Sequence, residues 1–246
     1  MMRNLRAAWR LWRVVLHIMH GAWTIWRSFP GLSQAQRDAR VQVWAQALVG
    51  KLAIQLVVQG QPADGPVLIV ANHISWLDIV AIHAARHCRF ISKSDIKHWP
   101  LIGMLATGAG TIYIERESRR DAMRVVHHMA EQLRAGDVLA VFPEGTTGDG
   151  STVLPFHANL LQAAITVNVP VQPLALSFVD GQTGQPSLVP CYIGEDTLLQ
   201  SLWRTVRADH IQAVLHFGTP ETAQGRDRRT WSADLRNTVS ALRARA

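Results

Sequence analysis

The strongest constraint on the fold is an alternation of short apolar runs with longer amphipathic ones after the turn-rich segment Gly60–Pro66. The short runs are rich in β-branched residues and the longer ones repeat with a helical period, which is typical of strands alternating with helices. This order predicts an α/β fold: a single domain with a largely parallel or mixed central sheet flanked by helices. The predicted strands are Val67–Ala71, Phe90–Ser92, Thr111–Ile114, Val138–Phe142, Val171–Phe178 and Ala213–Phe217. The clearest predicted helices are Ser118–Arg134, His157–Val167 and Ser232–Arg245.

The chain before this alternation predicts a separate helical segment. A length of 246 residues suits one α/β domain with a short extension. We therefore expect an N-terminal interfacial helical segment over residues 1–50 and the α/β domain over residues 51–246. Within this part of the chain, Ser33–Leu56 begins as a polar helix and continues either as an apolar helix or as a passage from helix to strand.

Composition narrows the class of partner. A formal charge of +7 indicates a polyanion, either nucleic acid or an anionic membrane. Nine tryptophans against two tyrosines favour lipid, because Trp prefers sites with one apolar and one wet edge. No DNA- or RNA-binding signature accompanies the charge, so we expect no nucleic-acid partner. Cys88 and Cys191 lack the spacing of a disulfide framework or a zinc site, which favours a reducing, cytosolic setting without a metal. His83 and His87 lack a third ligand and are interpreted as part of an exposed helix face.

Residues 1–27 predict a helix that lies on a membrane. On a helical wheel one arc of about 100° is cationic, and a neighbouring arc of similar width carries tryptophans. Such a helix lies in the headgroup plane, with its cations near anionic lipid. The alternatives are a core-packing helix with a solvated basic face, and a tilted or re-entrant span over residues 14–26. Gly21 is a candidate break between two helices. The cationic arc contains Arg3, Arg6, Arg10, Arg13, His17 and His20, and the other contains Trp9, Trp12, Trp23 and Trp26.

A His-Asp pair follows the predicted strand Val67–Ala71. His73 and Asp78 are five residues apart, so they meet only if His73 lies on the turn and the helix begins after it. Ser75 is a suitable N-cap for that helix. Asp78 would then fix the tautomer of His73 and leave the other ring nitrogen free to take a proton from an alcohol. Two alternatives stay open: Asp78 completes a capping box with Ser75, or His73 is an ordinary loop histidine.

A glycine-rich turn follows the predicted strand Val138–Phe142. Its backbone N–H groups suit a phosphate or an oxyanion, although Gly-Asp-Gly is also an ordinary tight turn. The turn lacks the pattern of a nucleotide-binding P-loop. The predicted strand Thr111–Ile114 ends in Glu115-Arg116, where the arginine suits either a phosphate or a surface ion pair.

Together and in this order, these segments closely resemble the glycerolipid acyltransferase superfamily, and most closely its bacterial 1-acyl-sn-glycerol-3-phosphate acyltransferases. The resemblance covers roughly residues 50–180. Lys93, with Pro100 and Gly103, resembles the family's lysine-containing helix. The four matching blocks are NHxxxxD at Asn72–Asp78, GTIYIER at Gly110–Arg116, FPEGT at Phe142–Thr146 and VPVQP at Val169–Pro173.

The resemblance implies that His73 is the general base and that Asp78 orients it. The acceptor hydroxyl then attacks the thioester of acyl-CoA or acyl-acyl-carrier-protein directly, with no acyl-enzyme and no further cofactor. The expected location of the protein is the cytoplasmic face of the bacterial inner membrane. Its expected partners are anionic lipid, the lysophospholipid acceptor and the acyl carrier protein. The implied substrate-binding residues are Asn72, Lys93, Arg116, Glu144, Gly145 and Thr146. The residues implied to shape the acyl or acceptor pocket are Pro143, Val171 and Pro173.

The sequence departs from the family at one informative position. Many members follow FPEGT with Arg-Ser, whereas Thr147 and Gly148 stand here. A cation is therefore missing beside the implied phosphate site, which favours a less anionic acceptor or compensation by Arg116 and Lys93. Acyltransferases that complete ornithine lipids from lyso-ornithine lipid resemble this sequence as well and are the alternative activity. A non-catalytic lipid-binding or membrane-tethering protein is the alternative from another class.

Overall fold

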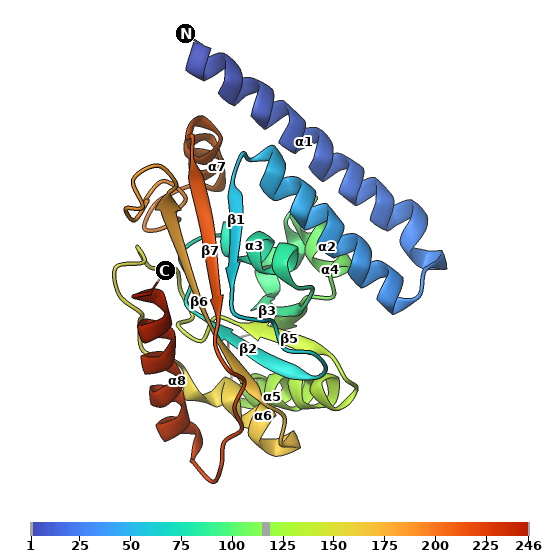
Figure 1. The fold of residues 1–246 in the computed structure, drawn as a ribbon. Helices are drawn as coiled ribbons and strands as arrows, with labels where there is room; N and C mark the ends of the chain where they lie inside the picture. Colours follow the sequence, from blue (N-terminus) through green and yellow to red (C-terminus); the bar gives the residue numbers. More distant parts are fainter. Residues whose placement is uncertain (1, 115–118, 246) are drawn as a thin grey trace.

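In a computed structural model, which describes residues 2–114 and 119–245, a seven-stranded sheet forms the centre of the molecule (Figure 1). The strand order is β1-β7-β6-β2-β5-β3-β4. Five neighbouring strands, from β6 to β4, run parallel, whereas β7 is antiparallel to β6 and β1 is parallel to β7. The prediction of a largely parallel or mixed sheet is confirmed. The strands are β1 Gln55–Gln59, β2 Val67–Ala71, β3 Arg89–Lys93, β4 Ile112–Ile114, β5 Val138–Val141, β6 Val171–Asp180 and β7 Ile211–Phe217.

Helices cover both faces of this sheet. The pleat of β2 sends Val67, Ile69 and Ala71 into one apolar cluster and Leu68 and Val70 into another, so the strand is buried on both sides. The first cluster lies under α1 Met2–Ser28, α2 Gln34–Lys51, α3 Leu77–Ala85 and α7 Leu198–Arg207, with α4 Ile102–Gly108 beside α1. The second lies under α5 Arg119–Arg134, α6 Leu161–Val167 and α8 Arg228–Arg243.

The N-terminal segment is one long helix that lies against α2, α4 and α7 (Figure 1). Gly21 does not divide it, contrary to the interpretation of this glycine as a break. A Cβ at this position would lie 2.4 Å from Nε1 of Trp44, so glycine serves here to let α1 and α2 approach closely. Among the described residues, no helix combines the length and the apolar character needed to cross a membrane.

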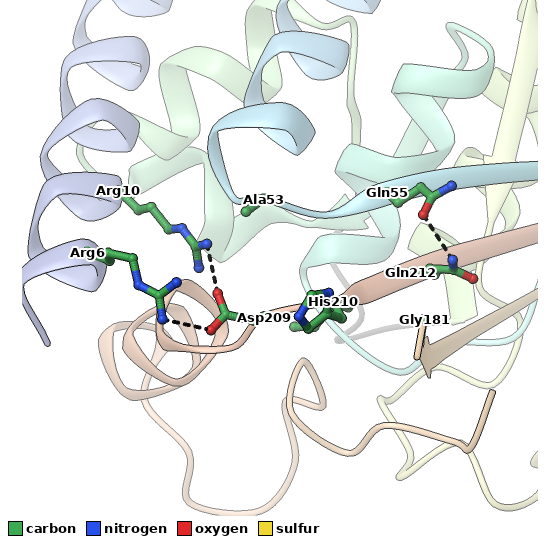
Figure 2. Close-up of a pocket in the computed structure, with 9 residues that line it drawn as sticks. Arg6, Arg10, Ala53, Gln55, Gly181, Asp209, His210 and Gln212 are labelled. Carbon is green, nitrogen blue, oxygen red and sulfur yellow. Dashed lines mark hydrogen bonds and ion pairs between the residues drawn. The ribbon is translucent and has the colours of Figure 1, made fainter. Parts of the chain in front are cut away.

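Part of the cationic arc of α1 binds the protein body, which differs from the expectation that the whole arc faces lipid headgroups. Arg6 and Arg10 both bind the carboxylate of Asp209, as Figure 2 shows. Arg10 also donates to the carbonyls of Val206 and Ala208, at the end of α7. The physical reason is that a helix C-terminus carries unpaired carbonyls and partial negative charge, which attract guanidinium groups.

The face of α1 that points away from the protein body lies beside the cationic arc and is apolar and exposed. Its large side chains follow each other at alternating intervals of three and four residues, which places them in one stripe along the helix. We call this set the α1 stripe. It consists of Met2, Leu5, Trp9, Trp12, Leu16, Met19, Trp23 and Trp26, all of them exposed.

Candidate active site

Two predicted motifs meet because their strands are neighbours. β2 and β5 are paired in parallel, from Val67 opposite Val138 to Val70 opposite Val141. Their carboxyl ends therefore lie at the same edge of the sheet, where the chain continues into Asn72 after β2 and into Phe142 after β5.

His73 and Asp78 form a hydrogen-bonded pair at this edge. Nδ1 of His73 lies 2.7 Å from Oδ2 of Asp78. With Asp78 ionised, Nδ1 carries the proton, and Nε2 on the far side of the ring becomes the acceptor. The His73 side chain is 18% exposed and Asp78 is fully buried, so solvent reaches the imidazole but not the carboxylate. The arrangement is that of a histidine general base with an orienting carboxylate.

Asp78 binds backbone N–H groups of the turn in addition to His73, so both interpretations of this residue apply. Oδ2 of Asp78 also accepts hydrogen bonds from the backbone N–H groups of Ile74 and Ser75, at 2.6 and 2.9 Å. α3 begins at Leu77, so Trp76 rather than Ser75 is its N-cap, although the hydroxyl of Ser75 accepts from the N–H of Leu77. One carboxylate thus fixes the turn and the imidazole at the same time.

The segment that follows β5, residues 142–154, wraps around His73. Oε1 of Glu144 accepts from the backbone N–H of His73 at 2.8 Å, and Oε2 accepts from the N–H of Leu154 at 3.0 Å. The N–H of Gly148 donates to the carbonyl of His73 at 2.8 Å. Burial raises the pKa of Glu144, while its two backbone hydrogen bonds oppose that rise. Glu144 is therefore oriented towards the protein rather than towards an anionic ligand.

An aromatic ring lies flat against the imidazole. The ring centroids of His73 and Phe142 are 3.9 Å apart with an interplanar angle of 7°. Phe90 of β3 lies behind Phe142, at 5.6 Å and 19°. Phe142 belongs to the FPEGT block. The sequence alone does not tell whether its ring packs in the core or against His73, so the sequence analysis gave it no role.

The remaining predicted substrate-binding residues differ in accessibility. Asn72 is buried, and both ends of its amide are bonded to the backbone of Leu176, where it bridges β2 to β6. Lys93 at the end of β3 and Thr146 after β5 are exposed. The N–H of Gly145 donates to the carbonyl of Phe142. Arg116 lies outside the described residues.

The residues predicted to shape a pocket are not all at this edge. Pro143 is buried directly beside the site, and its carbonyl accepts from the N–H of His157. Val171 pairs with Leu68, at the amino-terminal part of β2, and is fully buried in the second cluster. Pro173 pairs with Val70 and is buried as well. Because β6 runs parallel to β2, both positions precede the carboxyl edge where His73 lies.

The segment of residues 189–196, to which the sequence analysis gave no role, covers the turn after β2. The N–H of Tyr192 donates to the carbonyl of Ile74, and the hydroxyl of Thr147 donates to the carbonyl of Tyr192. Arg204 of α7 holds this segment through Asp196 and the carbonyl of Val189. The signal that was overlooked is the capping box Thr197-x-x-Gln200, which marks the start of α7.

Two hollows lie away from His73. One of about 470 Å³ lies between α1 and the start of strands β1 and β7, beside the Arg6–Asp209 pair (Figure 2). The other, of about 600 Å³, lies between α4 and the end of α1 and includes Phe29, Arg37 and Met104. Within the described residues, no cluster of three or more His, Cys, Asp or Glu side chains could hold a metal ion.

His83 is buried and His87 is half-buried, contrary to the interpretation that both lie on an exposed helix face. Their rings lie 5.3 Å apart, and His83 packs its edge against Phe90. Burial lowers the pKa of His83 to about 3 and also lowers the pKa of His87. Both histidines therefore stay neutral in the folded chain at neutral pH.

The chain belongs to the acyltransferase family. The sequence model of the family named Acyltransferase matches residues 55–177, which contain both strands and both turns of the site. The predicted family resemblance and the prediction of an acyltransferase are thereby confirmed.

Named relatives cover most of the chain. A lyso-ornithine lipid O-acyltransferase of Pseudomonas aeruginosa is 36% identical over 91% of this chain and 86% of its own. A 1-acyl-sn-glycerol-3-phosphate acyltransferase of Neisseria gonorrhoeae is 34% identical over 88% of this chain and 85% of its own. The crystal structure of a 1-acyl-sn-glycerophosphate acyltransferase, PlsC, of Thermotoga maritima covers 100% of this chain and 98% of its own, with a TM-score of 0.72. At 21% identity, that structure supports the fold alone.

Proposed function

We propose that the chain transfers a fatty acyl group from acyl-CoA or acyl-acyl-carrier-protein to the free hydroxyl of a lysolipid. The observation that carries this proposal is the His73–Asp78 pair, because it leaves a ring nitrogen free beside an accessible edge of the sheet. The proposal needs no metal or redox cofactor, since a positioned base and a thioester suffice for the chemistry.

The proposed reaction proceeds without an acyl-enzyme. Nε2 of His73 takes the proton from the acceptor hydroxyl as its oxygen attacks the thioester carbonyl carbon. The tetrahedral intermediate collapses, the carbon–sulfur bond breaks, and the imidazolium returns the proton to the departing thiolate. Asp78 stabilises the imidazolium in between, and backbone N–H groups of the turn after β5 are candidates for stabilising the oxyanion.

The first candidate acceptor is 1-acyl-sn-glycerol-3-phosphate, acylated at its sn-2 hydroxyl to give phosphatidic acid. Lys93, exposed at the carboxyl end of β3, and Arg116 are the proposed cations for its phosphate. The similarity to the acyltransferase of Neisseria gonorrhoeae supports this acceptor.

The second candidate acceptor is lyso-ornithine lipid. A specific observation favours it: Thr147 occupies the position where many family members carry an arginine, and its hydroxyl is bonded to Tyr192. The turn therefore offers one cation fewer to a phosphate. The similarity to the enzyme of Pseudomonas aeruginosa points the same way.

The proposed location is the cytoplasmic face of the bacterial inner membrane, with peripheral or monotopic attachment through the α1 stripe. Exposed tryptophans along one helix face are typical of a helix that lies in the interface. The cations that Asp209 and the end of α7 bind contribute little to this attachment, because they face the protein.

The test is an assay of the purified protein with labelled acyl-CoA and acyl-acyl-carrier-protein, against both acceptors side by side. We expect His73→Ala to lower kcat/KM by about 10²- to 10⁴-fold. The matched control is His127→Ala, since His127 is largely exposed on α5. A rate unchanged by His73→Ala would refute His73 as the base, and a wild-type protein without acyl transfer would support the non-catalytic lipid-binding alternative. The preferred acceptor would decide between the two candidates.

A further inference from the structure

His73 is held on its backbone, its ring nitrogen and its ring face at the same time. Four groups hold His73: the Asp78 carboxylate at Nδ1, the Glu144 carboxylate at its N–H, the Gly148 N–H at its carbonyl and the Phe142 ring on its face. Three of these groups belong to the segment that follows β5.

We infer that the segment Phe142–Gly148 acts in catalysis by positioning His73, and that Phe142 and Glu144 are its positioning residues rather than ligands of the substrate. The inference rests on the proposed function, since it concerns the base of that reaction. It differs from the implied role of Glu144, which was to bind the substrate.

Glu144 joins two backbone segments through its carboxylate. Both of its carboxylate oxygens accept from backbone N–H groups, one from His73 and one from Leu154, and the residue is only 6% exposed. A carboxylate with both oxygens engaged has little capacity left for a ligand, and its negative charge would repel a phosphate. The same two bonds tie the turn after β2 to the far end of the turn after β5.

Phe142 fixes the plane of the imidazole. Asp78 fixes the position of Nδ1, but the imidazole ring can still rotate about the hydrogen bond between Nδ1 and Asp78. A flat ring at 3.9 Å and 7° opposes this motion, because tilting the imidazole would break the stacking contact. Phe90 is 2% exposed and backs Phe142 from the core, so the stack is supported on its far side.

The energetic consequence falls on the transition state. A general base must meet the hydroxyl proton in a narrow geometry, and a displacement of about 1 Å costs about 10²-fold in rate. Residues that act through His73 should therefore change kcat and leave the acceptor KM nearly unchanged. Residues that hold the acceptor should change KM.

The experiment compares Glu144→Gln, Phe142→Leu and Phe142→Tyr in steady-state assays with varied acceptor. Glutamine keeps one acceptor oxygen and opposes the second N–H with its own amide donor, and leucine keeps apolar volume without a flat face. We expect kcat to fall by about 10- to 100-fold in these two variants, with acceptor KM within about twofold. Phe142→Tyr retains the ring and should restore kcat.

The matched controls are Glu221→Gln and Phe178→Leu. Glu221 accepts from Trp231 and Arg226, and Phe178 is buried in β6, so both changes disturb packing away from His73. They should lower Tm and leave kcat unchanged. Equal losses of kcat in the controls would overturn the inference, and so would a KM effect that dominates in Glu144→Gln.

A second readout needs neither substrate nor activity. Nitrogen-15 NMR of labelled His73 reports its tautomer, and we expect the single Nδ1–H form in the wild type to give way to a mixture in Glu144→Gln and Phe142→Leu. An unchanged spectrum in both variants would overturn the inference. If His73→Ala were fully active, the proposed function would fail while this spectroscopic result could still hold, so the two failures are distinguishable.

Discussion

The carboxyl edge of β2 and β5, where His73 lies, differs from helix α1 in which groups the protein binds and which it leaves exposed. At the edge, the protein binds both the N–H and the C=O of His73 and one of its ring nitrogens, which leaves Nε2 for chemistry. On α1, the protein binds Arg6 and Arg10 and leaves the α1 stripe exposed. One region is rigid around a single reactive atom, and the other presents a broad surface that selects no particular atom.

This difference shows what each region can recognise. A fixed ring nitrogen suits a reaction that depends on sub-ångström geometry. A stripe of Trp, Met and Leu suits the interior side of a membrane interface, where the gain scales with buried apolar area. Changes at the edge should therefore affect rate, and changes on α1 should affect attachment.

The largest expected effect is that of Asp78→Asn on rate. The asparagine amide can still accept at the position of Oδ2, but it is neutral and does not stabilise the imidazolium that forms during proton transfer. We expect kcat to fall by about 10³- to 10⁴-fold. The measurement is kcat with detergent-solubilised acceptor, and binding to vesicles should stay as in the wild type. A variant with more than a tenth of the wild-type kcat would contradict the role of Asp78.

The next effect concerns attachment. The combined change of Trp9, Trp12, Trp23 and Trp26 to Gln keeps the helix and removes most of the apolar area of the α1 stripe. We expect affinity for vesicles of phosphatidylglycerol and phosphatidylethanolamine to fall by more than about 100-fold, measured by sedimentation, with kcat on detergent-solubilised acceptor retained. The control is Met123→Gln, an exposed apolar side chain on the other face of the sheet. Undiminished binding would refute attachment through this stripe.

A smaller effect separates packing of α1 from its exposed face. In Gly21→Ala the added methyl group would meet Trp44, and we expect a loss of about 1–3 kcal/mol in the free energy of unfolding. Gly50→Ala is the matched control, because Gly50 also lies in a helix and nothing lies within 4 Å of the added Cβ. It should stabilise the protein by about 0.5–1 kcal/mol. Chemical denaturation of both variants checks the opposite signs.

The last expected effect is a dependence of stability on pH. Burial lowers the pKa of His83 to about 3, below its ordinary value of 6.5, so the unfolded state binds the proton more readily. Stability is therefore fully present above pH 6.5 and is lost as pH falls towards 3, by at most about 1.4 kcal/mol per pH unit. His83→Leu should flatten this slope more than His17→Leu on α1, since the pKa of His17 is lowered less. Equal slopes in urea titrations between pH 4 and pH 6.5 would contradict the assignment to His83.

The sequence by itself determined the features that depend on near neighbours in the chain. The apolar run Val67–Ala71 predicted a strand, which is observed as β2. A turn before α3 was the condition under which His73 and Asp78 could meet, and they do meet. The regular apolar spacing on residues 1–27 required an amphipathic helix, which is observed as α1. The passage from helix to strand, one of the two alternatives for Ser33–Leu56, is observed as α2 followed by β1. Helix α7 was not predicted, because the capping box before it was not used.

Only the tertiary structure decided which groups face one another. The partner of the His73 N–H is Glu144, 71 residues further along, and it became a neighbour because the sheet places β2 beside β5. The partner of Arg6 and Arg10 is Asp209, about 200 residues away, which turned the cations of α1 inward. The physical reason is that periodicity fixes the faces of an element, whereas strand order and helix docking fix what lies opposite each face.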